Sequence, residues 1–185
     1  SLMPKIGQTG YSVLQAISEL VDNSIDARED GRALTVEIFF DSDKGMVEIS
    51  DDGIGMNEQT AANSMKLAHS AKKNKRGEFG LGLKTAATSL GKNFQIDTTQ
   101  KGSDEEYIME YDEEKWLKSG DWTKHEMKIK SGVDKRRSGT TIRIKDLHFK
   151  HYGNLPGNIR KDLATRFAPF IENGEVKIKV NTKWC

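Results

Sequence analysis

The chain has 185 residues, enough for one domain with a sizeable hydrophobic core but too few for two full domains. Lysine and arginine total 29 against 28 aspartates and glutamates, so the net charge of +1 gives no global field that would attract nucleic acid or an anionic membrane. With one cysteine, Cys185, and no apolar run near the ~20 residues that span a bilayer, the chain is expected to be intracellular, cytoplasmic or nuclear, without a disulfide framework or membrane association.

The N-terminal part of the chain predicts a helix followed by a β-hairpin. Residues 11–30 carry apolar side chains at helical spacing. These are Val13, Leu14, Ile17, Leu20, Val21 and Ile25. Residues 34–40 and 46–50 then alternate apolar and polar side chains around a turn-forming stretch at 41–45, a pattern typical of two antiparallel strands.

The middle of the chain predicts two shorter helices separated by a loop. Residues 57–68 have a helical pattern, and the lysine-rich residues 70–77 are expected to form a loop. Residues 81–90 predict a second helix that ends at Gly91, because glycine commonly terminates helices. Two glycines lie at the entrance of this helix.

The remaining segments predict a meander of strands, interrupted by one helix. Strand-like alternation recurs at residues 93–99, 107–111, 125–130, 140–147 and 175–180. Residues 158–171 predict a helix that either tolerates Pro169 or breaks there. Helices before and between mostly antiparallel strands predict an α+β fold, a two-layer α/β sandwich with a mixed, mostly antiparallel sheet and helices on one face.

The stretch ELVDNSIDA, residues 19–27, sets an amide among acids on the first predicted helix. Glu19, Asn23 and Asp26 are spaced i, i+4 and i+7, which places them on one side of the helix, away from the apolar stripe. One interpretation is a solvated polar face. The other is a ligand site, in which the Asn23 amide oxygen coordinates a hard cation without adding charge.

The stretch DDGIGM, residues 51–56, follows a predicted strand with acids and two glycines. It is compatible with a polar turn after an edge strand. It is also compatible with a binding site, in which Gly53 and Gly55 let the backbone approach a flat ligand while a buried Asp51 accepts a hydrogen bond from it.

The stretch GEFGLGLKTAATSLG, residues 77–91, places Gly80 and Gly82 where a loop enters a helix. Free N–H groups and the helix dipole suit a phosphate there, and Lys84 adds a positive charge. A flexible hinge is the alternative. The pattern is neither a Walker loop nor a Rossmann fingerprint, because it lacks G-x-x-x-x-G-K-[ST] and the strand that precedes a dinucleotide-binding turn.

Taken in order, E-x-x-x-N-x-x-D-A, D-x-G-x-G-M, G-x-F-G-x-G and a later GTTIRIKDL resemble the GHKL superfamily of gyrase, heat-shock chaperone, histidine kinase and MutL ATPases. MORC-type and chaperone-like members look nearest. The resemblance covers nearly the whole chain and implies a Bergerat ATP-binding fold for residues 3–185, with residues 1 and 2 as a cloning remnant. It further implies an excised domain, without the transducer or middle domain that follows in relatives.

The resemblance also implies roles for individual residues. Glu19 matches the general base for the water that attacks the γ-phosphate, and Asn23 matches the Mg²⁺ ligand. Asp51 matches the acid that receives the adenine amino group, with an ordered water linking Gly55 and Thr141. The other positions implied to lie around the nucleotide are Asp26, Gly53, Met56, Phe79, Gly80, Leu81, Gly82 and Lys84.

The implied activity is binding and hydrolysis of Mg²⁺-ATP. Binding would close a lid at residues 57–79 and bring two copies together as a homodimer, and hydrolysis would release them. The work done would be DNA or chromatin remodelling, or remodelling of a protein client. Hydrolysis is expected to be slow in this chain, because relatives take a catalytic cation from the domain that follows. Two alternatives stay open: a histidine protein kinase domain, and a nucleotide-gated binding module with negligible hydrolysis.

Overall fold

The computed structural model describes residues 12–65, 82–119, 126–150 and 153–185. Within these residues, eight strands form one sheet in the order β5-β4-β3-β6-β2-β1-β7-β8. The strands are β1 (Leu34–Asp41), β2 (Met46–Asp51), β3 (Gly91–Thr99), β4 (Glu105–Asp112), β5 (Met127–Ser131), β6 (Gly139–Leu147), β7 (Val176–Val180) and β8 (Lys183–Trp184).

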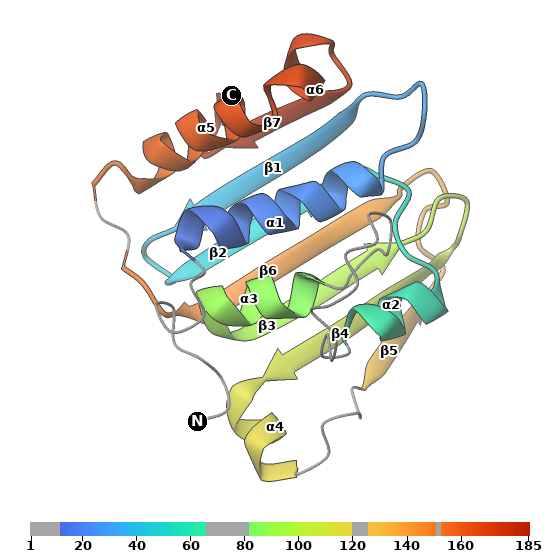
Figure 1. Ribbon diagram of the computed structural model, residues 1–185. Coiled ribbons are helices and arrows are strands. Elements are labelled where there is room, and N and C mark those ends of the chain that lie inside the picture. The colour runs from blue at the N-terminus through green and yellow to red at the C-terminus, as the bar shows by residue number, and fades with distance from the viewer. Residues whose placement is uncertain (1–11, 66–81, 120–125, 151–152) are drawn as a thin grey trace, which may run out of the picture.

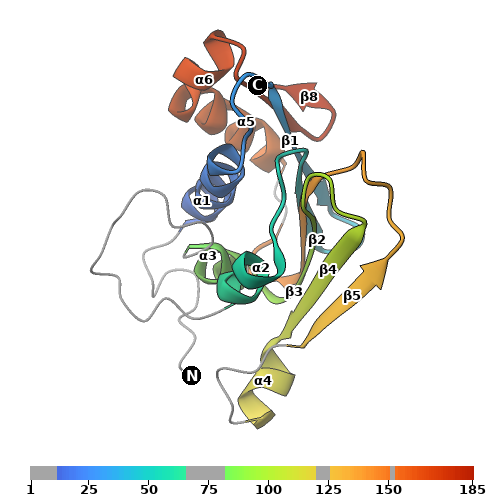
Figure 2. The same ribbon diagram turned by 90° about the vertical axis from the view of Figure 1, so that its right-hand side faces the viewer.

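The helices that cover the sheet lie on one of its faces (Figure 1). Figure 2 shows the sheet from its side, with α1, α2, α3 and α5 on the same side of it. The helices are α1 (Val13–Asp26), α2 (Glu58–Ser64), α3 (Leu83–Leu90), α4 (Glu113–Ser119), α5 (Leu155–Arg166) and α6 (Ala168–Glu172). The predicted two-layer α/β sandwich is therefore confirmed. None of the helices in the described residues is long and apolar enough to cross a membrane.

Strand pairing brings distant parts of the chain to one end of the sheet. β1 and β7 pair in parallel, and the other recorded pairs are antiparallel. In the β2–β6 pair Asp51 lies opposite Thr140, and in the β3–β6 pair Thr98 lies opposite Thr140. The last residue of β2, the end of β3 and the start of β6 are thus neighbours.

The core lies between the helices and the alternate strand residues that face them. From α1, Ile17, Leu20 and Val21 are fully buried, and from α3, Leu90 is fully buried. Strand side chains alternate between faces, so one face of β1, β2, β3, β4, β6 and β7 meets this layer while the other carries mostly polar residues. Burial of this stripe fixes the position and rotation of α1 on the sheet.

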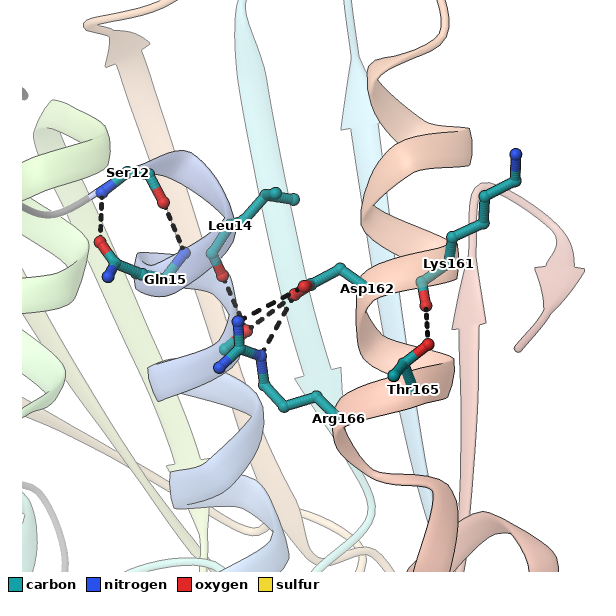
Figure 3. Close-up of polar contacts among 8 residues, drawn as sticks. Ser12, Leu14, Gln15, Lys161, Asp162, Thr165 and Arg166 are labelled. Atoms are coloured by element: carbon teal, nitrogen blue, oxygen red, sulfur yellow. Dashed lines mark hydrogen bonds and ion pairs between the residues drawn. The ribbon is translucent and has the colours of Figure 1, made fainter.

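Polar contacts fix the start of α1 (Figure 3). The Ser12 hydroxyl accepts a hydrogen bond from the Gln15 backbone N–H at 3.1 Å, and the Gln15 side chain accepts one from Ser12 N–H at 2.9 Å, which forms a capping box. Further along, Asp162 of α5 accepts a hydrogen bond from Arg166 Nε at 3.3 Å and lies 3.4 Å from the Ser18 hydroxyl. The helix is therefore anchored both to the sheet and to α5.

The structure shows whether the predicted helix at 158–171 tolerates Pro169 or breaks there. It also adds elements that the sequence did not predict. The predicted helix at 158–171 begins earlier, at Leu155, and breaks at Phe167, so Pro169 lies in the first turn of a separate helix, α6. α4 and β8 were not predicted. The predicted helix at 57–68 is described as α2 up to Ser64, whereas the expected loop at 70–77 lies outside the described residues.

Leu20→Ala tests the anchoring of α1 by its buried stripe. Because Leu20 is 0% exposed, its truncation leaves a cavity, and we expect a loss of about 2–5 kcal/mol in the free energy of unfolding. The matched control is Leu117→Ala, the same change in α4 at a side chain that is 51% exposed, which should cost under about 0.5 kcal/mol. Urea unfolding measures both, and equal losses would contradict the burial assigned to α1.

Candidate functional site

The three sequence motifs meet along α1. The Ser24 hydroxyl of α1 donates a hydrogen bond to Asp51 Oδ2 at 2.8 Å, which joins the first motif to the second. The third motif reaches the first at Gly82, because a Cβ added to Gly82 would lie 2.3 Å from Glu19 Oε1. Segments that are separate in the sequence therefore form one site along α1.

Asp51 carries a desolvated carboxylate, although the residue is partly exposed. The pKa of Asp51 is raised to about 6, chiefly by burial and to a smaller extent by the neighbouring Asp52. Hydrogen bonds from the Ser24 hydroxyl and from the backbone N–H groups of Gly53 and Thr140 oppose this rise, because they stabilise the charged form. A carboxylate held in this way is oriented to accept a further hydrogen bond from a ligand.

Glycine is required at two positions beside Asp51. A Cβ at Gly53 would lie 2.8 Å from the Ala27 carbonyl oxygen. Gly55 has φ of +71°, and a Cβ there would lie 1.9 Å from the Thr99 carbonyl oxygen. The backbone between them is pinned by a hydrogen bond from Ile54 N–H to the Ala27 carbonyl oxygen at 2.9 Å. The two glycines therefore let this segment pack closely against the protein's own backbone, at Ala27 and at Thr99 of β3. The approach to a flat ligand expected from the sequence stays a prediction.

The threonine beside Asp51 is Thr140, not the Thr141 expected from the sequence. The Thr141 hydroxyl lies on the opposite face of the sheet, 2.9 Å from the Ser50 hydroxyl. Thr140 is buried, pairs with Asp51 and lies 2.9 Å from the Thr98 hydroxyl. Successive strand residues point to opposite faces, so the Thr-Thr dipeptide allowed either assignment until the register was known.

Glu19 and Asn23 lie on the polar side of α1, beside Gly82. Burial raises the pKa of Glu19, and the carboxylates of Asp22 and Asp26 raise it further. The Nδ2 atom of Asn23 is buried and has no hydrogen-bond partner among the described residues. A buried N–H donor without a partner indicates a place where an oxygen atom of a bound molecule would accept its hydrogen bond.

Asp26, at the end of α1, has its side chain exposed. The expected lid-side residues Phe79, Gly80 and Leu81 lie outside the described residues. Met56 is buried, with 1% of its surface exposed. Its backbone N–H donates to the Thr98 hydroxyl at 2.9 Å, which holds the end of the second motif against β3.

Lys84, in the first turn of α3, is directed at two aromatic rings. Its side chain is 1% exposed, and its Nζ lies 5.3 Å from the centre of the Tyr111 ring and 5.2 Å from that of the Trp116 ring. Burial lowers the pKa of Lys84 to about 8. Attraction of the ammonium to the ring faces offsets part of the cost of desolvation. The phosphate contact expected for Lys84 stays a prediction.

Within the described residues, no group of three or more His, Cys, Asp or Glu side chains could hold a metal ion. The Mg²⁺ contact expected for Asn23 stays a prediction.

Sequence reasoning missed three hydroxyl residues of the site, Ser24, Thr98 and Thr140. Ser24 lies within the first motif, and serine is an uncommon choice for the buried side of a helix interior, which is the signal that could have identified it. Thr98 and Thr140 are polar residues at inward-facing strand positions, a break in the alternating pattern. All three are buried.

Comparisons with known proteins agree with this arrangement. A family model described as histidine kinase-, DNA gyrase B-, and HSP90-like ATPase matches residues 11–140. ATPase morc-1 of Caenorhabditis elegans is 39% identical over 95 residues, which cover 51% of this chain and 11% of that protein. Protein MICRORCHIDIA 7 of Arabidopsis thaliana is 32% identical over 97 residues, which cover 49% of this chain and 14% of that protein. The chain thus spans only a small part of these relatives.

The fold is also found in a solved structure. The ATPase region of Saccharomyces cerevisiae topoisomerase II superposes with a TM-score of 0.62 at 16% identity. The match covers 93% of this chain and 48% of that chain. At this identity the likeness concerns the fold alone.

Asp51→Asn tests the cost of the buried carboxylate. The folded-state pKa of about 6 is higher than the usual value near 4, so the folded protein holds this proton more tightly, and wild-type stability falls as the pH rises through 6. The amide carries no charge, so at pH 8 we expect Asp51→Asn to be about 1–3 kcal/mol more stable than wild type, with the gap closing towards pH 4.

Urea unfolding at pH 4.5, 6 and 8 measures this difference, with the exposed turn variant Asp43→Asn as the control. We expect Asp43→Asn to follow wild type at each pH within about 0.5 kcal/mol. A loss of stability in Asp51→Asn at pH 8 would mean that the hydrogen bonds to the carboxylate outweigh its desolvation.

Proposed function

Because the chain belongs to the family of histidine kinase-, DNA gyrase B- and HSP90-like ATPases and is similar to MORC proteins, we propose that it binds Mg²⁺-ATP and hydrolyses it. The observation that carries the proposal is the meeting of Asp51, Glu19 and Gly82 along one helix. This meeting supports the proposal, in which Asp51 accepts a hydrogen bond from a base, Glu19 activates a water and the N-terminus of α3 binds phosphate.

Adenine recognition is assigned to Asp51. The adenine amino group is a donor and would meet a carboxylate already held by Ser24 and Gly53. Guanine carries a carbonyl at the same position, which would face the carboxylate with a lone pair. The preference for adenine therefore follows from charge and hydrogen-bond direction, and does not require a steric gate.

Water activation is assigned to Glu19. Its raised pKa, caused by burial and by two neighbouring acids, makes it a stronger base than an exposed glutamate. Gly82 lets the N-terminus of α3 approach Glu19 closely, so phosphates bound at that N-terminus would lie next to the base. Asn23 is the protein ligand proposed for Mg²⁺, which would screen the repulsion between the phosphates and Glu19.

Several wider properties belong to the same proposal. ATP binding closes a lid and brings two copies together, and slow hydrolysis releases them, in the service of DNA, chromatin or protein remodelling. The support is the similarity to MORC proteins, of which the chain spans only 11% and 14%. Phosphate transfer to a protein partner, as in a histidine kinase, is distinguished from hydrolysis by whether free phosphate is the product.

Calorimetric titration of Mg²⁺-ATP into wild type, Asp51→Ala and Glu19→Gln tests the two assignments. Removing a hydrogen bond to a charged acceptor costs roughly 1.5–3 kcal/mol, so Asp51→Ala should weaken binding by about 10–100-fold. Glu19→Gln should bind within a few fold of wild type, but its release of phosphate should fall by about 10²-fold or more, because the base is lost.

Two outcomes of these titrations would contradict the proposal. The first is no heat and no thermal stabilisation of the wild type at millimolar Mg²⁺-ATP. The second is equal affinity in Asp51→Ala and wild type, which would place the adenine elsewhere. Robust turnover by this chain would contradict the expectation of slow hydrolysis but would leave the site assignments intact.

Lys84→Met tests the proposed phosphate contact of that lysine separately from its packing. Methionine keeps an unbranched chain over Tyr111 and Trp116 but removes the charge. If the ammonium pairs with phosphate, affinity for Mg²⁺-ATP should fall about 10-fold, while affinity for adenosine should not change. If the ratio of the affinities for Mg²⁺-ATP and adenosine is the same in the variant as in wild type, Lys84 serves only to hold α3 against β4 and α4.

A further inference from the structure

Arg28 directly follows the ELVDNSIDA stretch and joins the end of α1 to two later elements. Its Nη1 donates a hydrogen bond to the Ile25 carbonyl oxygen at 2.9 Å. Its guanidinium carbon lies 5.1 Å from the centre of the Phe170 ring in α6, and its Nη2 lies 3.6 Å from Oε2 of Glu175, the residue before β7. With its side chain only 29% exposed, Arg28 is largely enclosed by these contacts, although the proposed nucleotide site makes no use of it.

The backbone beside Arg28 holds the second motif. The peptide group between Ala27 and Arg28 donates its N–H to the Ile25 carbonyl oxygen at 3.1 Å, and its own carbonyl oxygen accepts the Ile54 N–H at 2.9 Å. A Cβ at Gly53 would lie 2.8 Å from the same Ala27 oxygen, so a rotation of this peptide group would displace the second motif. The Arg28 guanidinium bonds to the same Ile25 carbonyl as the Arg28 N–H does, and it therefore restrains that rotation.

The partners of Arg28 in α6 and before β7 restrain the guanidinium in turn. The other oxygen of the Glu175 carboxylate accepts a hydrogen bond from Asn173 Nδ2 at 3.0 Å, so its position does not depend on Arg28 alone. The backbone N–H of Glu175 donates to the Phe170 carbonyl oxygen at 3.0 Å, which links the two partners. A planar guanidinium that meets a carbonyl, a ring face and a carboxylate satisfies all three in few orientations.

From these contacts we infer that Arg28 is a positioning residue. It holds the Ala27 carbonyl in place, and with it the segment whose Gly53 N–H donates to Asp51. The position of this segment thereby depends on α6 and the start of β7. The effect on ligand affinity rests on the proposed function, whereas the effect on the backbone does not.

Amide hydrogen exchange of Arg28→Met, measured by NMR without ligand, tests the inference on the backbone. Methionine keeps an unbranched chain against Phe170 but removes the guanidinium. We expect the Ile54 N–H, whose acceptor is the Ala27 carbonyl, to exchange about 10-fold faster than in wild type, because its hydrogen bond opens more often. The Ile96 N–H, in a strand paired on both sides, reports global unfolding, and the Ile54 rate should rise relative to it.

Arg143→Met is the matched control. Arg143 has a similar exposure of 32% and pairs with Glu48 at 3.0 Å, but it lies in β6 on the face of the sheet that carries Thr141. We expect it to leave the Ile54 exchange rate within about 2-fold of wild type.

Glu175→Gln removes one partner of Arg28 at a side chain that is 47% exposed. It should accelerate the Ile54 exchange by about 2–3-fold, because one of three restraints on the guanidinium is lost. If Arg28→Met does not fold, as thermal unfolding would show, Glu175→Gln carries the same comparison with this smaller effect.

Under the proposed function, calorimetry separates the base side of the site from its phosphate side. Arg28→Met should weaken the binding of adenosine by about 5–10-fold, because the hydrogen bond from Gly53 that orients Asp51 is disturbed. The affinity for Mg²⁺-tripolyphosphate should stay within about 2-fold. Combining Arg28→Met with Glu175→Gln should weaken adenosine no further, because both act through one side chain.

The outcomes separate the inference from the proposed function. An unchanged Ile54 exchange rate in Arg28→Met, or a rise no larger than that of Ile96, would overturn the inference. Losses that add in the double variant would overturn the dependence on Glu175, and equal weakening of adenosine and tripolyphosphate would overturn the assignment of Arg28 to the base side. If the wild type binds neither adenosine nor Mg²⁺-ATP, the proposed function fails, and the Ile54 exchange rate still decides whether Arg28 positions the backbone.

Discussion

The hydrogen bond between Ser24 and Asp51 is the contact on which the site depends. It joins α1 to the end of β2 at 2.8 Å and requires the helix to lie close over the sheet. That approach leaves no room for a side chain at Gly53, where a Cβ would meet the Ala27 carbonyl oxygen at 2.8 Å. Burial of the apolar stripe of α1 provides the force that holds the helix there. One side of α1 thus packs in the core, and the other side carries residues of the candidate site.

The same close packing desolvates the charged groups of Asp51 and Lys84. Burial raises the pKa of the acid and lowers that of the lysine, because it disfavours the ionised form of both groups. The protein compensates them differently. Asp51 is held by directed N–H and O–H donors, which leaves the carboxylate specific in orientation, whereas Lys84 is held by ring faces, which constrain direction less. The first arrangement suits recognition of a fixed group such as a base edge.

The spacing of apolar residues predicted the sandwich and its strands. A helix or strand that is buried on one face has apolar residues at regular intervals, and this pattern can be seen in a short stretch of sequence. The break before Pro169 was left open by the sequence, because a proline can either be tolerated in a helix or start a new one, and the short helix α4 was not predicted. Whole motifs indicated Glu19 and Asp51 as candidate site residues, and their roles stay predictions. Thr141 was assigned in place of Thr140, because a one-residue shift in register changes the face and register is set by pairing with β2. The direction of Lys84 depended on Tyr111 and Trp116, which are distant in sequence.

The spacing of functional groups along α1 has a mechanical consequence. Glu19 and Ser24 are five residues apart, about 7.5 Å along the axis of a helix. Ser24 is hydrogen-bonded to Asp51, the acid proposed to bind the base, and Glu19, the proposed catalytic carboxylate, lies against the N-terminus of α3. A helix is stiff over this length, so under the proposed function a displacement of α1 at Asp51 would move Glu19 by a similar amount relative to α3. The distance between these two groups is therefore set by one rigid element, whose position is held by the core.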